Sequence, residues 1–371
     1  RPRDPQRLLT LLPTAKPFTV NGKDFVAVPH RLDETRVLRN LGVDAPSPIR
    51  YYYDWPGLFK PMEHQKSTAS FLTLNKRSFC FNEQGTGKTA SAIWAADYLM
   101  EHKVIRRVLV VCPLSVVRNW EAEAERFAPN MRVMVHHGTG RLDHPEFVTA
   151  TAAHELVITT YQIAARDLDA MQQVRWSTLV LDEAQAVKNP DTATSRAMRS
   201  IYAEQHIALT GTPVENRLRE LWSIFHIVVP GLLGNATKFR DRFATPIERQ
   251  HDPAATAALR SLVGPFLLRR TKADRSLVPD LPDKIEQVAW ATLTREQVQM
   301  YQAVVDHLLH DDADLRVERQ AVLVPERHDV HPQPRCVPRV GEQLVELSHP
   351  GVAAVRKISR VGNRANHLWI A

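Results

Sequence analysis

The chain has 371 residues, of which 44% are hydrophobic and 24% are charged. These proportions are typical of a globular protein and exclude a collagen-like, coiled-coil or mainly disordered chain. The formal net charge of +7, from 48 Lys and Arg against 41 Asp and Glu, is compatible with a polyanionic partner and equally with solubility alone. The apolar runs are shorter than the ~18 residues of a membrane span, so we expect no membrane partner. Because the first residue is Arg1 rather than Met, we expect the protein to start upstream.

Residues 1–57 are interrupted by prolines and predict a small N-terminal appendage. Within it, Asn21 and Gly22 separate two apolar runs at 18–20 and 25–28. An Asn-Gly dipeptide between such runs is typical of a tight turn with positive φ angles. The segment therefore predicts a β-hairpin.

Residues 58–229 alternate between short apolar runs and amphipathic segments. The apolar runs predict buried strands at 79–81, 108–111, 131–135, 156–159, 178–181 and 207–209. One of the segments between them carries apolar residues at helical spacing, at Val116, Trp120, Ala124 and Phe127. Continuously apolar strands that alternate with helices predict an α/β domain built on a doubly wound parallel sheet.

Residues 230–311 predict helical segments and loops. Within them, Thr294 and Gln297 form a capping-box pattern that predicts the start of a helix. Residues 312–371 are rich in Pro, His, Arg and Val. We expect a poorly ordered or non-native tail there.

Residues 82–89 read Asn-Glu-Gln-Gly-Thr-Gly-Lys-Thr and lie between a predicted strand and a predicted helix. A phosphate site needs backbone N–H groups that converge at a helix N-terminus, and the glycines allow the tight turn. Lys88 supplies a positive charge for the β- and γ-phosphates, and the Thr89 hydroxyl can bind Mg²⁺. The strict pattern has a glycine in place of Asn82, and asparagine adopts left-handed backbone more readily than most residues. The predicted nucleotide contacts are Asn82, Glu83, Gln84, Gly85, Thr86, Gly87, Lys88 and Thr89.

Two carboxylates, Asp182 and Glu183, directly follow the predicted strand at 178–181. Adjacent side chains at the end of a strand point to opposite sides. We interpret Asp182 as a Mg²⁺ ligand and Glu183 as the base that orients the attacking water. The predicted catalytic residues are thus Lys88 and Glu183, and the predicted metal ligands are Thr89 and Asp182.

Several longer strings resemble those of the SWI/SNF-type DNA-dependent ATPases of helicase superfamily two, in the family's order, across about residues 58–305. They are Val-Cys-Pro-Leu-Ser-Val-Val-Arg-Asn-Trp at 111–120, Ala-Gln-Ala-Val-Lys-Asn-Pro at 184–190, Thr-Gly-Thr-Pro-Val-Glu-Asn at 210–216 and Phe-Leu-Leu-Arg-Arg-Thr-Lys at 266–272. Asp-Glu-Ala-Gln at 182–185 is similar to the DEAH motif of superfamily two as a whole. The P-loop is most similar to those of bacterial and phage members. The resemblance implies a P-loop NTPase lobe of the RecA-like fold at 58–229, followed at 230–311 by a family-specific helical insertion and inter-lobe segment.

The resemblance also implies roles for single residues. Gln65 matches the glutamine that reads adenine, a task suited to an amide that both donates and accepts. In the family, loops after the strands track one DNA strand through backbone N–H groups and hydroxyls, which contact phosphate without reading sequence. The matching residues are Pro113, Ser115, His137, Gly138, Thr159, Thr160 and Tyr161. The residues that would couple hydrolysis to the DNA-facing side are Thr210, Gly211 and Thr212.

A basic cluster at Arg269, Arg270 and Lys272 follows the predicted lobe. The cluster would lie beside the expected cleft between two lobes, where it would stabilise the closed form of the two-lobed enzyme or contact DNA. A solvated charged face is the alternative interpretation.

The resemblance implies an enzyme that uses ATP and Mg²⁺ to move on double-stranded DNA or to remodel DNA-bound proteins, in the cytoplasm of a bacterial cell or phage-infected host. Family members carry a second RecA-like lobe that supplies an arginine finger, and the residues after about 305 match none of its motifs. We therefore expect a truncated chain that is weakly active alone. Two alternatives remain: a non-catalytic nucleic-acid or protein-binding module, and an RNA helicase of the DEAD/DEAH type.

Overall fold

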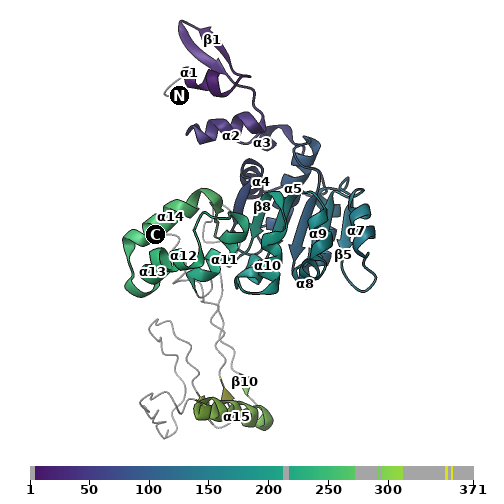
Figure 1. The fold of residues 1–371 in the computed structure, drawn as a ribbon, viewed down its shortest axis with the longest axis vertical. Coiled ribbons are helices and arrows are strands. Elements are labelled where there is room, and N and C mark those ends of the chain that lie inside the picture. The colour runs from purple at the N-terminus through teal and green to yellow at the C-terminus, as the bar shows by residue number, and fades with distance from the viewer. Residues whose placement is uncertain are drawn as a thin grey trace, which may run out of the picture. The chain divides into compact units, whose positions relative to one another are not determined.

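Figure 1 shows the computed structural model of the protein, which describes residues 5–211, 217–271, 291–292, 294–311, 347–349 and 352–353. These residues belong to two compact units. The first unit holds the described residues up to 271, and the second holds those from 291 to 353. Within the described part of the chain, no helix combines the length and the apolar character that crossing a membrane requires.

A seven-stranded sheet forms the centre of the first unit, in the strand order β5-β6-β4-β7-β8-β3-β9. Every neighbouring pair runs parallel. The strands are β3 (Arg77–Cys80), β4 (Val108–Cys112), β5 (Val133–His136), β6 (Leu156–Thr160), β7 (Trp176–Asp182), β8 (Ala203–Leu209) and β9 (Leu267–Leu268). The predicted α/β class and parallel sheet are therefore confirmed.

Helices pack on both faces of this sheet (Figure 1). They are α4 (Glu63–Leu74), α5 (Lys88–Glu101), α6 (Val117–Phe127), α7 (His144–Thr151), α8 (Tyr161–Arg166), α9 (Leu168–Gln173), α10 (Ala193–Ser200) and α11 (Leu218–Val228). Successive residues of β4 point to opposite faces. Leu109 and Val111 belong to one apolar cluster with residues of α7 to α11, whereas Val108 and Val110 belong to a second with residues of α4 to α6. This two-sided burial explains why the strands are apolar throughout.

Short turns and further helical segments complete the first unit. The 3₁₀ turns are η1 (Leu114–Val116), η2 (Ala184–Val187) and η4 (Gly264–Phe266). After α11 the chain forms α12 (Ala236–Phe239), a π-helical turn η3 (Arg240–Ala244), α13 (Thr245–Gln250) and α14 (Pro253–Val263).

The N-terminal residues form α1 (Pro5–Leu11), β1 (Lys16–Val20), β2 (Lys23–Ala27), α2 (Leu32–Asn40) and α3 (Ile49–Tyr52). Strands β1 and β2 pair antiparallel. The turn between them consists of Asn21 and Gly22, with φ angles of 50° and 71°. The predicted hairpin is therefore confirmed.

Two aromatic residues attach this N-terminal segment to helix α5. The Tyr53 hydroxyl donates a hydrogen bond to Oδ2 of Asp97 at 2.6 Å. The ring of Trp55 packs edge-on against Trp94, with 5.8 Å between the ring centroids. Both Tyr53 and Trp55 are buried, so they join the N-terminal segment to the core of the first unit.

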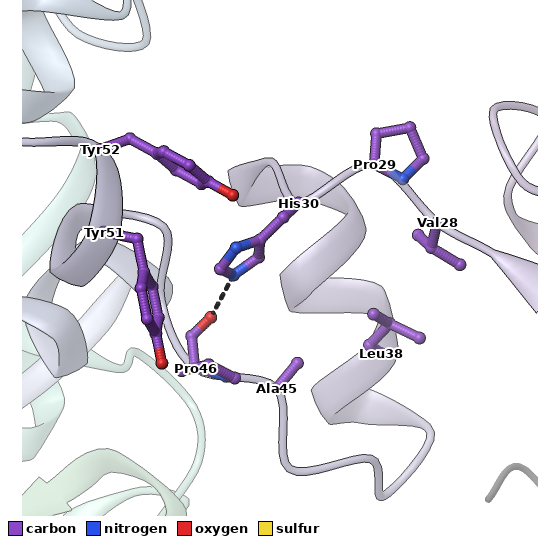
Figure 2. A pocket seen from close by; sticks show the side chains of 8 residues that line it. All are labelled: Val28, Pro29, His30, Leu38, Ala45, Pro46, Tyr51 and Tyr52. Carbon is purple, nitrogen blue, oxygen red and sulfur yellow. Dashed lines mark hydrogen bonds between the residues drawn. The ribbon is translucent and has the colours of Figure 1, made fainter.

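A cavity of about 410 Å³ lies within the N-terminal segment (Figure 2). His30 lies near Tyr51 and Tyr52, with ring centroids 5.6 and 5.4 Å apart, and its Nε2 atom is 2.8 Å from the carbonyl oxygen of Pro46. All lining residues come from 28–52. The cavity is therefore separate from the nucleotide contacts predicted at 82–89.

The sheet differs most from the sequence prediction at two strands. Strand β8 begins at Ala203 rather than at 207. Strand β9 lies in a segment for which the sequence predicted helices and loops, yet Leu267 and Leu268 pair with β3 at the edge of the sheet. A two-residue strand is too short to show a periodic pattern, which is why the prediction missed it.

The second unit, taken by itself, contains β10 (Ala291–Thr292), α15 (Arg295–Asp311), β11 (Leu347–His349) and β12 (Val352–Ala353). Its strands pair antiparallel in the order β10-β12-β11. The backbone N–H of Thr294 donates to Oε1 of Gln297 at 3.0 Å, and the N–H of Gln297 donates to Oγ1 of Thr294 at 3.3 Å. The predicted capping box at the start of α15 is therefore confirmed.

Candidate nucleotide-binding site

The loop between β3 and α5 has the geometry of a phosphate-binding turn. Gly85 and Gly87 have φ angles of 76° and 73°, a left-handed conformation that favours glycine. Helix α5 begins at Lys88, and the first N–H groups of a helix have no partner within it. Residues 82–87 and the N-terminus of α5 therefore form a cradle suited to an anion.

Asn82 occupies this loop for a reason other than the one the sequence suggested. Its φ angle is not positive, so tolerance of left-handed backbone does not explain it. Its side chain is buried, and Nδ2 donates a hydrogen bond to Oγ1 of Thr68 on α4 at 3.1 Å. Asparagine fits here because its amide ties the loop to α4.

The Lys88 side chain folds over the same loop. Its Nζ atom donates hydrogen bonds to the carbonyl oxygens of Asn82 at 3.0 Å and Glu83 at 3.2 Å. The Thr86 hydroxyl donates to the same Glu83 carbonyl at 2.8 Å. The positively charged Lys88 ammonium group, predicted to bind phosphate, therefore lies directly at the cradle.

Helix α4 brings Gln65 to the loop. The Oε1 atom of Gln65 accepts a hydrogen bond from the backbone N–H of Met62 at 2.9 Å, and its Nε2 atom lies so close to Gly87 that a Cβ atom there would overlap it. On the same helix, Nε2 of His64 is 3.1 Å from the carbonyl oxygen of Thr86. The predicted adenine-reading side chain thus lies beside the predicted phosphate loop.

Asp182 lies at the end of β7 and is 6% exposed. Trp120 donates from Nε1 to its Oδ2 at 2.7 Å, and the backbone N–H of Glu183 donates to its Oδ1 at 2.9 Å. The Tyr161 hydroxyl donates to the backbone carbonyl of Asp182 at 2.8 Å. Burial raises the pKa of Asp182, and the hydrogen bond from Trp120 opposes that rise. The sequence predicted neither aromatic contact.

Glu183, the predicted base, has a φ angle of 46°, a left-handed conformation that is uncommon for residues other than glycine. Its Oε2 atom accepts a hydrogen bond from Nε2 of Gln185 at 2.8 Å. The Oε1 atom of Gln185 in turn accepts from the Thr210 hydroxyl at 2.6 Å. Gln185 therefore bridges the predicted base and a predicted coupling residue. Gln185 was not among the predicted site residues, and its place at the end of the Asp-Glu-Ala-Gln string is the signal that could have identified it.

The loop after β8 lies against the P-loop. A Cβ atom on Gly211 would lie 2.9 Å from Cγ of Gln84 and 3.8 Å from Nζ of Lys88. This close approach explains why the smallest residue stands at this position. Thr212, the third predicted coupling residue, lies outside the described residues.

Thr89 and Asp182 offer oxygen atoms, the ligand type that Mg²⁺ prefers. Each carboxylate oxygen of Asp182 receives one hydrogen bond, which leaves lone pairs for a cation. The donor set therefore fits Mg²⁺. Among the described residues, no group of three or more His, Cys, Asp or Glu side chains forms a separate metal candidate.

Arg270 joins the segment after β9 to α4 and to the P-loop. Its guanidinium donates hydrogen bonds to three atoms on α4: the carbonyl of His64 at 3.2 Å, the hydroxyl of Ser67 at 2.6 Å and the hydroxyl of Thr68 at 2.7 Å. Its carbonyl accepts from the backbone N–H of Glu83 at 3.0 Å. A solvated face is therefore the wrong interpretation for Arg270. Lys272 of the same basic cluster lies outside the described residues.

The predicted DNA contacts lie at or directly after the ends of β4, β5 and β6, whereas the predicted nucleotide, catalytic and coupling residues at 82–89, 182–183 and 210–211 lie at or directly after the ends of β3, β7 and β8. In the strand order of the sheet, β5, β6 and β4 are neighbours at one end, and β7, β8 and β3 follow next to them. Because all are parallel, both sets lie at the same edge of the sheet. Of the predicted contacts, Ser115 is exposed, and the half-buried ones are Pro113, His137 and Gly138.

Thr159, Thr160 and Tyr161 do not face solvent, because each is at most 2% exposed. The Thr159 hydroxyl donates to the carbonyl of His136 at 2.9 Å, and Oγ1 of Thr160 accepts from the backbone N–H of Ile163 at 3.3 Å. The Tyr161 hydroxyl is bound to Asp182. Contrary to the prediction, these hydroxyls are not presented to a DNA phosphate in this structure.

A polar cluster supports the loop at residues 137–138. Arg141 donates from Nη1 to the Gly138 carbonyl at 3.1 Å. It also binds both carboxylate oxygens of Asp167, at 2.7 and 3.1 Å, and Nε2 of His136 is 3.0 Å from the same carboxylate. The hydrogen bond from Arg141 lowers the pKa of Asp167. The loop is therefore anchored to the turn that precedes α9.

Comparison with known proteins identifies relatives of this chain. The SNF2-related domain matches residues 64–327. The chain is 38% identical over 248 residues to the putative ATP-dependent helicase/translocase YwqA of Bacillus subtilis, which covers 66% of this chain and 27% of that protein. It is 33% identical over 230 residues to the ISWI chromatin-remodeling complex ATPase ISW2 of Saccharomyces cerevisiae, covering 61% of this chain and 20% of that protein. The chain thus spans only a minor part of the length of these relatives.

Solved structures show the same similarity. The SWI2/SNF2 ATPase core of Sulfolobus solfataricus in complex with dsDNA matches with a TM-score of 0.56 and 34% identity, over 71% of this chain and 56% of that chain. This similarity confirms the predicted RecA-like fold. The chain belongs to the SNF2-related domain family and is homologous to SWI/SNF-type helicase-like ATPases.

Proposed function

We propose that this chain forms the ATP-binding lobe of an enzyme that hydrolyses ATP with Mg²⁺ and moves on double-stranded DNA. The proposal rests on one observation. At the carboxyl ends of the parallel strands, residues 182–185 are hydrogen-bonded to Thr210, and Gly211 lies against the P-loop. A Sulfolobus ATPase core of similar fold was solved with dsDNA, which supports duplex DNA as the partner.

In the proposed site, the cradle at 82–87 and the N-terminus of α5 bind the phosphates. Lys88 neutralises their charge, and Gln65 contacts the adenine edge. Thr89 and Asp182 would hold Mg²⁺, which would supply further charge neutralisation at the transferring phosphoryl group.

Glu183 accepts the proton of the attacking water and holds that water in line with the γ-phosphate. The Gln185 amide positions the Glu183 carboxylate by donating from Nε2 to Oε2 of Glu183, and its Oε1 atom accepts a hydrogen bond from the Thr210 hydroxyl. A movement of the loop after β8 would therefore shift Glu183 through the Gln185 side chain.

Duplex DNA would lie along the loops after β4 and β5. Pro113, Ser115, His137 and Gly138 are the proposed contacts, through backbone N–H groups and the Ser115 hydroxyl. Thr159, Thr160 and Tyr161 support these loops from the core. Proteins bound to the DNA are proposed as further partners, which the similarity to a chromatin-remodeling ATPase supports.

The test combines binding of a fluorescent ATP analogue with phosphate release in the presence of duplex DNA. Lys88→Ala is expected to weaken nucleotide binding at least about tenfold, because it removes a charge-assisted contact worth more than 1.4 kcal/mol. Glu183→Gln should retain binding and lose hydrolysis by about 100-fold or more. Lys23→Ala, at an exposed lysine of the hairpin, is the control and should change neither quantity.

The same measurements separate the alternatives. A non-catalytic binding module would bind DNA with no nucleotide dependence, and neither Lys88→Ala nor Glu183→Gln would alter that binding. An RNA helicase would prefer RNA to duplex DNA in a competition assay. Either result would replace the proposed function.

We also propose that this chain by itself hydrolyses ATP slowly. In other NTPases an arginine finger from outside the P-loop lobe raises the rate by about three to five orders of magnitude. The described residues form one RecA-like sheet. DNA-stimulated turnover of about 1 s⁻¹ or faster by this chain would contradict the proposal. Because ATP and duplex DNA meet in the bacterial cytoplasm, that compartment is the proposed location.

A further inference from the structure

Two buried aromatic side chains reach Asp182 from the half of the sheet formed by β5, β6 and β4, where the proposed DNA contacts lie. Trp120 lies on α6, which directly follows the 3₁₀ turn η1 that carries the exposed Ser115. Tyr161 begins α8, directly after the last residue of β6. Each is 2% exposed, and each donates one hydrogen bond to Asp182, at 2.7 Å from Trp120 and 2.8 Å from Tyr161.

The two donors bind different parts of Asp182. The indole N–H of Trp120 binds Oδ2 of the carboxylate, so it sets the direction in which the carboxylate faces a cation. The Tyr161 hydroxyl binds the backbone carbonyl at the junction between β7 and Glu183. Glu183, the predicted base, has a φ angle of 46°. The backbone at this junction therefore also sets the direction in which the Glu183 side chain points.

The order of the strands makes these contacts specific. Strand β4 lies between β6 and β7, so the Tyr161 hydroxyl reaches across two inter-strand spacings, about 10 Å, to the end of β7. A leucine or phenylalanine would bury a similar apolar area at either position, but neither could donate a hydrogen bond. The polar atoms of both side chains therefore have a role beyond filling the core.

We propose that Trp120 and Tyr161 are positioning residues that transmit DNA contact to the Mg²⁺ ligand Asp182. The inference rests on the proposed function, since it needs DNA bound at Ser115 and at residues 137–138 to move η1 and, through the hydrogen bond from Thr159 to His136, the end of β6. Hydrogen bonds weaken steeply when they are bent, so a small rotation of α6 changes how Oδ2 is held. DNA would therefore change the affinity for Mg·ATP, and Mg·ATP would change the affinity for DNA by the same factor.

The test measures the Mg²⁺ concentration at half-maximal binding of a fluorescent ATP analogue to the full chain, with and without duplex DNA. Trp120→Phe keeps an aromatic ring and removes the N–H donor. It is expected to raise this Mg²⁺ midpoint about tenfold, the usual cost of losing an outer partner of a metal ligand, and to abolish the effect of DNA on the midpoint. Tyr161→Phe removes one oxygen atom and is expected to reduce the effect of DNA.

Trp176→Phe is the matched control. Trp176 is also 2% exposed, and its Nε1 atom donates one hydrogen bond to the Met171 carbonyl at 2.8 Å, which the substitution removes. Trp176 lies at the opposite end of β7 from Asp182. It should leave the Mg²⁺ midpoint and its response to DNA unchanged. If Trp120→Phe does not fold by circular dichroism, the single-atom change Tyr161→Phe decides the outcome.

The possible results are distinguishable. If Trp120→Phe and Tyr161→Phe behave as Trp176→Phe does, the inference is overturned and the proposed function stands. A wild-type chain that binds Mg·nucleotide with no response to DNA also overturns the inference. A wild-type chain with no Mg²⁺-dependent nucleotide binding overturns the proposed function itself.

Discussion

Arg270 donates a hydrogen bond from Nη1 to Oγ1 of Thr68, with 2.7 Å between the two atoms. The same Thr68 hydroxyl accepts a hydrogen bond from Nδ2 of Asn82 in the P-loop. One threonine on α4 therefore links the nucleotide loop to the segment that follows β9. Because the Arg270 carbonyl also binds the N–H of Glu83, this segment contacts the P-loop through both its backbone and its side chain.

Arg270→Ala is expected to lower the free energy of unfolding by about 2 kcal/mol, because it removes hydrogen bonds from a charged donor to part-buried acceptors. It should also weaken binding of a fluorescent ATP analogue, since α4 carries Gln65. Urea denaturation and a binding titration check the two effects. Arg240→Ala is the control, because Arg240 is exposed and pairs with its neighbour Asp241, a contact worth less than about 1 kcal/mol. Equal effects of the two variants would contradict the structural role of Arg270.

Gly87→Ala is expected to cost about 1–2 kcal/mol of stability, because residue 87 has a φ angle of 73° and side chains disfavour that conformation. The new Cβ atom would also displace the Gln65 amide, so nucleotide binding should weaken. Gly140→Ala is the matched control, since a Cβ atom there meets nothing within 4 Å. Thermal denaturation and nucleotide titration of both variants provide the measurement. Unchanged nucleotide affinity in Gly87→Ala would show that residue 87 does not shape the site.

Gln65→Glu separates two roles of one side chain. The glutamate keeps an oxygen that can accept the hydrogen bond from the backbone of Met62, but it loses the amide donor proposed to read adenine. We expect the stability to be retained and the preference for ATP over GTP to fall about tenfold or more. Gln65→Ala should lower both the preference and the stability, the latter by about 1 kcal/mol. Competition binding with ATP and GTP measures the preference. An unaltered preference in Gln65→Glu would contradict the proposed contact between Gln65 and adenine.

Asp167→Asn tests the cluster beneath the loop at 137–138. Because the hydrogen bond from Arg141 lowers the pKa of Asp167 in the folded state, the ionised carboxylate stabilises the fold. This contribution is complete above the unfolded pKa of about 3.9 and is lost as the pH falls through the folded pKa. The wild type should therefore be more stable than Asp167→Asn at neutral pH, and the difference should shrink below about pH 4.

Urea denaturation of both chains at several pH values measures this difference. His136 also contacts the carboxylate. Burial lowers the pKa of His136 and Asp167 opposes that change, so Asp167→Asn should lower the pKa of His136 further. A stability difference that is independent of pH would contradict the ion-pair explanation. Asp241→Asn, at an exposed carboxylate beside Arg240, serves as the control and should show little difference at any pH.

Some site residues were predictable from the sequence because their roles depend on near neighbours. Gly85 and Gly87 marked the loop because only glycine readily adopts its left-handed turns. Lys88 was predicted because it follows that loop at a helix start. The sequence does not indicate that the hydroxyls of Thr159 and Thr160, two of the predicted DNA contacts, are bound within the core. Whether a hydroxyl faces solvent depends on the neighbouring strand, which the local pattern does not specify.

The local sequence was sufficient to predict the α/β class, the Asn21–Gly22 hairpin, the capping box at Thr294 and the P-loop. Each of these depends on residues within a few positions of one another, so its physical cause is visible in the local pattern. Two contacts became visible only in the folded chain: Trp120 binds Asp182, 62 residues away, and Arg270 binds Thr68, 202 residues away. Such contacts depend on the order of the strands and on the side that each helix covers, and these are set by packing of the whole sheet.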